Sequence, residues 1–279
     1  MNVAIIGMGL IGGSMALVMK AKGIASKVMG VDQNIEHCQK AIELGLVDEI
    51  LEMNEAIKNA DLIVLAIPVD KIINLLPGIL NKVDKQVLMD VGSTKAGMLN
   101  SIKNHPKKCR FVGTHPMWGT EFSGPQAARK DAFINKAVVI CNKEACDKDA
   151  IIVVESLYKT IGMHVIYMNA ADHDVHVAYV SHISHITSFA LANTVLEKEK
   201  EEDAIFELAS GGFESTVRLA KSNPETWASI FLQNKENVLD VLNEHINQLQ
   251  MFKLYLETEN HERLENLMSN ANKINRILK

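Results

Sequence analysis

Short apolar runs and helical segments alternate along the first part of the chain. The apolar runs, which are rich in β-branched residues, occupy residues 2–6, 27–32, 60–68, 86–93, 110–116, 137–141 and 163–168. Apolar residues recur at helical spacing in the segments between them, over residues 10–22, 34–45, 70–81, 95–104 and 147–161. Continuously apolar strands that alternate with helices indicate a doubly wound parallel sheet covered on both faces. Residues 1–168 are therefore predicted to form an α/β domain.

The pattern changes after residue 168, because no further strand signal appears. Helical periodicity covers roughly residues 171–198, 202–210, 214–222, 224–257 and 260–278. Asn223 followed by Pro224 has the form of an N-cap and a first helical residue, and the pair Gly211 and Gly212 is expected to interrupt the helices. Residues 169–279 are therefore predicted to form an all-α domain.

The helix predicted from Pro224 onward is unusually long and rich in apolar residues. One small domain would struggle to cover side chains such as Trp227, Phe231, Leu242 and Leu249. An apolar helix surface of this kind is typical of a subunit interface. We therefore expect a homodimer that forms through the helical domain.

The composition narrows the classes of partner and compartment. The 279 residues carry a formal net charge of -5 and no basic run, which argues against nucleic acid and anionic membrane surfaces. No apolar stretch reaches the length of a membrane helix, and the first strand begins one residue after Met1, so a cytoplasmic protein is expected. The spacing of the four cysteines fits no zinc motif, so reduced thiols and no metal site are expected. An anionic substrate would need local cations in this acidic chain.

A glycine-rich turn follows the first predicted strand. It reads G-x-G-x-x-G and precedes a predicted helix, and Asp32 ends the second strand about twenty residues later. This arrangement is typical of a Rossmann-like dinucleotide site with the pyrophosphate at the helix N-terminus; the alternative is a turn that only packs a helix on a sheet. Unless it is an exposed loop acid, Asp32 would bind the adenosine ribose and repel a 2′-phosphate, which favours NAD over NADP. The predicted cofactor-binding residues are Gly7, Gly9, Leu10, Ile11, Gly12, Asp32, Ile67, Pro68 and Ser93.

Two polar residues stand at the ends of later strands. Ligands of open α/β sheets bind outside the carboxyl ends of the strands, and both Ser93 and His115 fall at such ends. Pro116 favours an extended backbone at His115, which would direct the imidazole into the cofactor crevice. Ser93 is equally compatible with a plain helix N-cap.

The helical half contributes imidazoles and one isolated arginine. His182 and His185 lie three residues apart on one helix face, without an H-E-x-x-H motif or a neighbouring carboxylate that would suggest metal binding. They are expected to line a polar cleft, the alternative being half-exposed helix histidines. Arg218 follows the glycine pair and could reach the same cleft as a cation, although a surface salt bridge is the common fate of a helix arginine.

Five segments together resemble the prephenate dehydrogenase family, which includes cyclohexadienyl and arogenate dehydrogenases. They are "GMGLIGGS", "DVGSTK", "GTHPMWGTEFSG", "HDVHVAYVSHISH" and "STVRLAKSNPETWASIFLQNKENV", in matching order and spacing over nearly the whole chain. The resemblance implies NAD(P)-dependent oxidative decarboxylation of prephenate to 4-hydroxyphenylpyruvate, in tyrosine biosynthesis, by a homodimer. Hydride passes to the nicotinamide while a histidine takes the hydroxyl proton, and aromatisation of the ring drives the loss of carbon dioxide.

The resemblance also implies roles for individual residues. His115 would be the general base, assisted by Ser93 near the reacting hydroxyl. Arg218 would anchor a substrate carboxylate with two parallel hydrogen bonds. The remaining predicted substrate-binding residues are His182, His185, Thr120 and Glu121, of which Glu121 would pair with the arginine at the mouth of the site. Trp118, Ile183 and Ser184 depart from the family pattern, which affects the expected shape of the pocket.

Three alternatives to a prephenate dehydrogenase can be compared with the sequence. The substrate could be arogenate, which differs from prephenate only in its side chain. A β-hydroxyacid dehydrogenase would need a G-x-x-G-x-x-x-K-x-x-x-N stretch at the start of the helical half, and the sequence has none. A non-catalytic NAD-binding dimeric regulatory protein would not require His115, Ser93 and Arg218 together.

Overall fold

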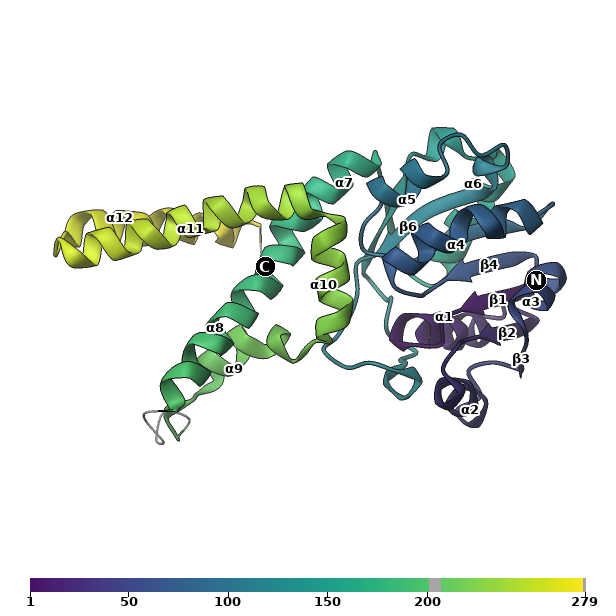
Figure 1. Ribbon diagram of the computed structural model, residues 1–279, viewed down its shortest axis with the longest axis horizontal. Coiled ribbons are helices and arrows are strands. Elements are labelled where there is room, and N and C mark those ends of the chain that lie inside the picture. The colour runs from purple at the N-terminus through teal and green to yellow at the C-terminus, as the bar shows by residue number, and fades with distance from the viewer. Residues whose placement is uncertain (201–206, 278–279) are drawn as a thin grey trace. The chain divides into compact units, whose positions relative to one another are not determined.

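The computed structural model describes residues 1–200 and 207–277, and it is built on an eight-stranded sheet (Figure 1). The strands are β1 (Asn2–Ile6), β2 (Lys27–Val31), β3 (Glu49–Ile50), β4 (Leu62–Leu65), β5 (Val87–Asp90), β6 (Phe111–Pro116), β7 (Ala137–Cys141) and β8 (His164–Met168). Their order across the sheet is β3-β2-β1-β4-β5-β6-β7-β8. Neighbouring strands are parallel except β6 and β7, which are antiparallel. The predicted α/β fold is confirmed. The sheet is not entirely parallel as predicted, because β7 and β8 run opposite to the other six strands.

The register aligns the carboxyl ends of the central strands. Ile6 at the end of β1 pairs with Val31 of β2 on one side and with Leu65 of β4 on the other. Leu65 in turn pairs with Asp90 at the end of β5. The chain winds outward in both directions from β1 and β4, so the residues after these strands meet at a topological switch point.

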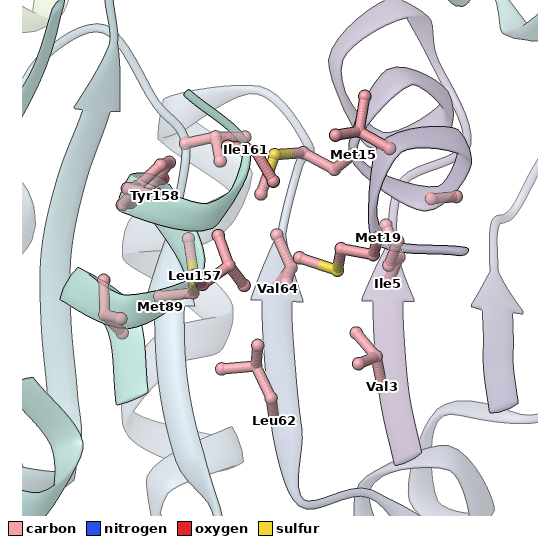
Figure 2. Close-up of a cluster of buried hydrophobic side chains, with 14 of the residues drawn as sticks. Val3, Ile5, Met15, Met19, Leu62, Val64, Met89, Leu157, Tyr158 and Ile161 are labelled. Atoms are coloured by element: carbon pink, nitrogen blue, oxygen red, sulfur yellow. The ribbon is translucent and has the colours of Figure 1, made fainter. Parts of the chain in front are cut away.

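Helices cover both faces of the sheet. They are α1 (Leu10–Ala21), α2 (Ile35–Glu43), α3 (Met53–Asn59), α4 (Val69–Lys82), α5 (Ala96–Ser101) and α6 (Lys148–Thr160). On one face, Met15 and Met19 of α1 and Leu157 of α6 pack over Val64 and neighbouring strand residues (Figure 2). On the other face, α3, α4 and α5 bury side chains such as Ile57. The sequence analysis missed two short elements, β3 and α3.

The rest of the chain is helical, as predicted. Its helices are α7 (Ala170–Val177), α8 (Ile183–Glu199), α9 (Gly211–Val217), α10 (Pro224–Gln233), α11 (Lys235–Glu257) and α12 (His261–Ala271). A π-helical turn, Ala178–His182, joins α7 to α8, and 3-10 segments follow α9 and α12. The predicted N-cap at the start of α10 is confirmed, because the Asn223 side chain accepts a hydrogen bond from Thr226 N.

Several predicted helix boundaries are wrong. The helix expected over residues 224–257 breaks at Asn234, whose buried side chain donates to the Asp174 carbonyl oxygen at 2.6 Å. The π-helical turn divides the helix expected over residues 171–198. Gly211 and Gly212 begin α9 instead of interrupting a helix. The helix expected over residues 202–210 falls mainly on residues 201–206, which lie outside the described residues.

The chain forms two compact units, Met1–Asn234 and Lys235–Lys279. The unit Met1–Asn234 contains the sheet, the helices that cover it, and α7, α8, α9 and α10. The second consists of α11 and α12, which pack against each other, and the 3-10 segment after them. Within residues 1–200 and 207–277, no helix combines the length and apolar character that a membrane span requires.

Candidate active site

A cavity of about 870 Å³ opens where the central strands end, as expected for a ligand site in an open α/β sheet. Residues of α10, including Trp227 and Ile230, close part of its wall. Of the predicted site residues, those that line it are Gly7, Gly9, Leu10, Ile11, Asp32, Ile67, Pro68, Ser93, His115, Thr120 and Glu121. The cavity therefore brings the predicted nucleotide site and the predicted base together. Gly12, His182, His185 and Arg218 are not among its lining residues.

The glycine turn leaves space at one position and none at the other two. A Cβ on Gly7, which has a φ of 103°, would lie 2.4 Å from the Ala66 carbonyl oxygen. A Cβ on Gly12 would lie 1.9 Å from the Gly7 carbonyl oxygen, so both glycines are required for packing α1 against the sheet. A Cβ on Gly9, the N-cap of α1, would meet no atom within 4 Å. Gly9 therefore leaves open space at a helix N-terminus, which is the environment that a phosphate group needs.

Asp32 is held in a fixed orientation at the end of β2. Its Oδ2 accepts a hydrogen bond from Met8 N at 2.7 Å, and its Oδ1 accepts one from Asn34 N at 2.8 Å. The side chain is only 14% exposed, and His37 Nδ1 lies 3.6 Å from Oδ2. The carboxylate retains lone pairs on the cavity side for further donors, such as ribose hydroxyls. His37 was missed by the sequence analysis, since its contact depends on how α2 packs beside β2.

His115 and Ser93 meet the cavity from adjacent strands. His115 lies near the end of β6, and Ser93 follows β5. Ser93 does not cap α5, because that helix begins at Ala96 with Lys95 as its N-cap. Burial, and next the neighbouring His173, lower the pKa of His115 well below the ordinary value for histidine. His115 is therefore a neutral imidazole at physiological pH.

A second histidine contacts His115 from the helical half of the chain. His173 Nε2, on α7, lies 2.9 Å from His115 Nδ1. The other ring nitrogen of His173 lies 2.7 Å from Asp174 Oδ1, and both residues are buried. Asp174 also accepts hydrogen bonds from the backbone N–H groups of Lys95 and Ala96, each at 2.8 Å. The carboxylate of α7 thus satisfies the N-terminus of α5 and holds His173 against His115.

A fully buried ion pair lies beneath the site. Lys95 Nζ contacts Asp90 Oδ2, and neither side chain is exposed. Asp90 also accepts hydrogen bonds from Thr114 N at 3.0 Å and from Gly92 N at 2.7 Å. This carboxylate therefore ties the end of β5 to the residue that precedes His115. A buried charge of this kind is tolerated only when it is paired and hydrogen-bonded, as it is here.

Arg218 reaches the rim of the cavity through Glu121. Its Nη1 lies 2.9 Å from Glu121 Oε2, in an ion pair that joins the helical half to the loop after β6. The Arg218 side chain is half exposed, whereas Glu121 is largely covered. The backbone N–H of Glu121 lowers the pKa of its carboxyl, and Arg218 lowers it further. The ion pair therefore places a cation beside the cavity residue Glu121.

His182 and His185 contact the cavity wall instead of the cavity itself. The His185 ring stacks on Trp227 with centroids 3.3 Å apart, and its Nδ1 lies 3.2 Å from the Ser181 carbonyl oxygen. The buried ring of His182 packs edge-on to Trp227, with centroids 6.0 Å apart. Trp227 itself lines the cavity, so both histidines support one of its walls.

Besides His37, four residues at or next to this site were not assigned to it from the sequence. His173 and Asp174 stand in the segment "HDVHVAYVSHISH", which carries the family resemblance, but no periodicity relates them to His115. Lys95 stands in "DVGSTK", where a lysine reads as an exposed residue. Trp227 was assigned to a subunit interface. The available signal was their place in the matching segments, and their partners depend on long-range packing.

Comparisons with known proteins agree with this arrangement. Residues 15–167 match the family described as prephenate dehydrogenase, nucleotide-binding domain, and residues 169–270 match prephenate dehydrogenase, dimerization domain. Prephenate dehydrogenase of Bacillus subtilis (strain 168) is 30% identical over 94% of this chain and 72% of its own length.

Solved structures give the same result. Prephenate dehydrogenase from A. aeolicus, in complex with hydroxyphenyl propionate and NAD+, superposes with a TM-score of 0.87 at 31% identity, covering 99% of this chain and 97% of that one. Synechocystis arogenate dehydrogenase superposes with a TM-score of 0.76 at 26% identity and covers both chains fully. Because both domain models match and these relatives align over nearly the whole chain, the chain belongs to the prephenate dehydrogenase family of oxidoreductases.

Proposed function

We propose that this protein catalyses the NAD-dependent oxidative decarboxylation of prephenate to 4-hydroxyphenylpyruvate, in tyrosine biosynthesis. One observation carries the proposal: the half-buried, neutral imidazole of His115 and the glycine turn of β1 and α1 line the same cavity. A base and a dinucleotide site must share one cavity if a proton and a hydride are to leave the same substrate carbon and its hydroxyl.

NAD fits the residues of the nucleotide half. Gly9 leaves room at the N-terminus of α1 for the pyrophosphate, and Leu10, Ile11 and Gly12 supply backbone N–H groups there. Asp32 would accept hydrogen bonds from the adenosine ribose, and its charge would repel a 2′-phosphate. Ile67 and Pro68, together with Ser93, would border the nicotinamide end. When bound, NAD supplies the acceptor for the hydride.

His115 would take the proton of the ring hydroxyl. A neutral imidazole is required for this step, and its depressed pKa keeps it neutral at physiological pH. Ser93, on the neighbouring strand end, can donate to or accept from the same hydroxyl and orient it. A positioned base contributes roughly 10² to 10⁴ in rate, and aromatisation of the ring then drives the loss of carbon dioxide.

The carboxylates of the substrate would be held at the rim. Arg218 presents a guanidinium that can bind a carboxylate with two parallel hydrogen bonds, and half of its side chain is accessible. Glu121 accepts a hydrogen bond from Nη1 of this guanidinium. A substrate carboxylate would therefore either displace Glu121 or bind the N–H groups that Glu121 leaves free. Thr120 lines the cavity beside Glu121 and offers a hydroxyl.

We also propose that His182 and His185 serve substrate binding through the shape of the site. Both rings contact Trp227, which forms part of the wall facing the substrate space. Fixing this indole fixes the width of the cavity opposite the base.

The helical half is further proposed to form the homodimer, with the division of the chain at residues 168 and 169. The dimerization-domain match over residues 169–270 supports this assignment. Apolar side chains that remain exposed on α11 and α12, such as Leu249, Leu254 and Met268, support a partner surface there. Sedimentation of the purified protein over a range of concentrations would test it, and a monomer at all concentrations would contradict it.

Arogenate is the second candidate substrate, and the likeness to Synechocystis arogenate dehydrogenase favours it. Purified protein would be mixed with NAD and either prephenate or arogenate, and the absorbance of the reduced cofactor followed. Prephenate dehydrogenase activity predicts reduction with prephenate and much slower reduction with arogenate. Reduction with neither substrate would refute both proposals.

A further inference from the structure

Three residues form a continuous hydrogen-bonded chain that ends at the proposed base. His115 Nδ1 lies 2.9 Å from His173 Nε2, and His173 Nδ1 lies 2.7 Å from Asp174 Oδ1. His115 comes from β6, whereas the other two come from α7. All three occupy buried or half-buried positions, where hydrogen bonds are not replaced by water.

The protons of this chain can be assigned from its acceptor end. An ionised Asp174 can only accept, and it already accepts from Lys95 N and Ala96 N. His173 Nδ1 must therefore carry the proton that it shares with Asp174. In a neutral His173 the other nitrogen, Nε2, is then an acceptor, so the proton between the two rings belongs to His115 Nδ1. A neutral His115 with a proton on Nδ1 has its lone pair on Nε2.

We propose that His173, itself oriented by Asp174, is a positioning residue that fixes the Nδ1–H tautomer of His115 and so leaves Nε2 as the proton acceptor. This inference rests on the proposed role of His115 as the base. Without His173 the imidazole could place its proton on either nitrogen, and the tautomer with Nε2–H cannot accept the hydroxyl proton at that atom.

The pair of rings also has a defined electrostatic setting after the proton has moved. When Nε2 takes the hydroxyl proton, His115 becomes a cation whose Nδ1–H still donates to His173, which donates to the Asp174 carboxylate. Asp174 thereby stabilises the charge that forms on His115. The titratable groups that face the two rings from other elements are Lys95 before α5 and His182 on the π-helical turn. Asp90 on β5 is paired with Lys95, and Cys141 on β7 lies near Asp174. Burial and the positive charge of Lys95 disfavour a proton that persists on His115, so the proposed base would return to its neutral form once product leaves.

Nitrogen NMR of protein labelled in its histidine rings tests the tautomer directly and without substrate. The signal of His115 would be assigned by its loss in His115→Asn. We expect the Nδ1–H form in the natural protein near neutral pH and a mixed or Nε2–H form in His173→Phe. An Nε2–H tautomer in the natural protein would overturn the proposal, whatever the protein proves to oxidise.

Kinetics of matched variants test the consequence. His173→Gln places an amide oxygen that can accept from His115 Nδ1, so kcat should stay within about tenfold, whereas His173→Phe should lose roughly 10² to 10⁴ in kcat with little change in either KM. His176→Gln, an exposed histidine on the same helix, is the control and should behave as the natural protein. Equal losses in the Gln and Phe variants, or a pure rise in KM, would contradict a positioning role. If the natural protein oxidises neither prephenate nor arogenate, the proposed function fails while the NMR result still decides the tautomer.

Discussion

Replacing His182 should remove a large part of the acid sensitivity of the folded protein. The ring is buried between Trp227 and Phe231, and its Nδ1 lies 3.3 Å from Asn234 Nδ2. Its Nε2 is buried and has no hydrogen-bond partner within the part of the chain that the structure describes. A proton added to His182 would thus create a buried cation whose Nε2–H has no hydrogen-bond acceptor among the described residues to offset the loss of water. Burial lowers the pKa of His182 to about 4, with Asp174 acting in the opposite direction.

The magnitude follows from proton linkage. In the unfolded chain a histidine titrates near 6.5, whereas the pKa of His182 in the folded protein is about 4. Above the unfolded value both states are neutral, and the free energy of unfolding is not affected. As the pH falls below about 6.5 the unfolded chain takes up a proton that the folded protein refuses, so stability is lost until the pH passes the folded pKa. At about pH 5 the loss attributable to this one group is roughly 2 kcal/mol.

Urea denaturation near pH 7 and near pH 5 measures this loss for the natural protein and for His182→Gln, which keeps polar atoms but cannot titrate. The free energy of unfolding of the natural protein should fall by about 2 kcal/mol more than that of the variant. Protein concentration must be equal throughout, because the proposed dimer would add a concentration-dependent contribution to stability. His176→Gln removes an exposed histidine of the neighbouring helix α7 and should keep the acid sensitivity of the natural protein. If His182→Gln loses as much stability as the natural protein, the buried imidazole is not the group responsible.

Four further predictions address the site itself. His115→Asn should reduce kcat by roughly 10² to 10⁴ while calorimetry finds unchanged NAD affinity, and unaltered turnover would rule out His115 as the base. In the natural protein kcat/KM should fall only as the pH drops below the ordinary histidine range, because the pKa of His115 is lowered. Arg218→Ala should lower kcat/KM for prephenate, chiefly by raising KM, and the loss should correspond to about 2 kcal/mol of binding free energy. This is the low end for a stranded charge partner, because the arginine is half exposed. Asp32→Ala should narrow the ratio of kcat/KM values between NAD and NADP, and tight NADP binding by the natural protein would reverse the cofactor assignment. Lys95→Met should lower the free energy of unfolding by about 3 to 5 kcal/mol because it strands Asp90, and adding Asp90→Asn should recover part of that loss; a loss that the second change leaves intact would mean that the ion pair is not the cause.

The nucleotide half could be predicted from sequence because each signal there is local. The strands and the glycine turn are contiguous in the chain, and the rule that ligands bind at strand ends placed Ser93 and His115 in one cavity. The helix boundaries failed where tertiary contacts outweigh periodicity. The clearest case is Asn234, whose side chain hydrogen-bonds the carbonyl oxygen of Asp174, sixty residues away, and ends a helix that the apolar pattern continues.

The hydrogen-bond partners of His115, the proposed base, could not be predicted for the same reason. His173 lies 58 residues after His115, and only the packing of α7 against α5 and the sheet brings the two rings together. The apolar pattern of a strand specifies which face is buried, whereas it carries no information on which polar atom of a distant helix will meet the strand end. His182 and His185 illustrate the converse, since their helical spacing identified a shared face and left open that Trp227 covers it.

Helix α7 is fastened to the sheet at two points, and these contacts place His173 beside the proposed base His115. Asn142 Oδ1, just after β7, accepts from Ala170 N at 2.8 Å, so the start of α7 is fastened to the sheet. One turn later, Asp174 accepts from the backbone of Lys95 and Ala96, which fastens the same helix to the N-terminus of α5. With α7 held at both points, His173 lies in hydrogen-bonding contact with His115. Without α7, His115 would lose the hydrogen-bond partner that we propose fixes its tautomer. If His115 is the base, as proposed, its proton abstraction therefore depends on the packing of α7 against α5 and the sheet.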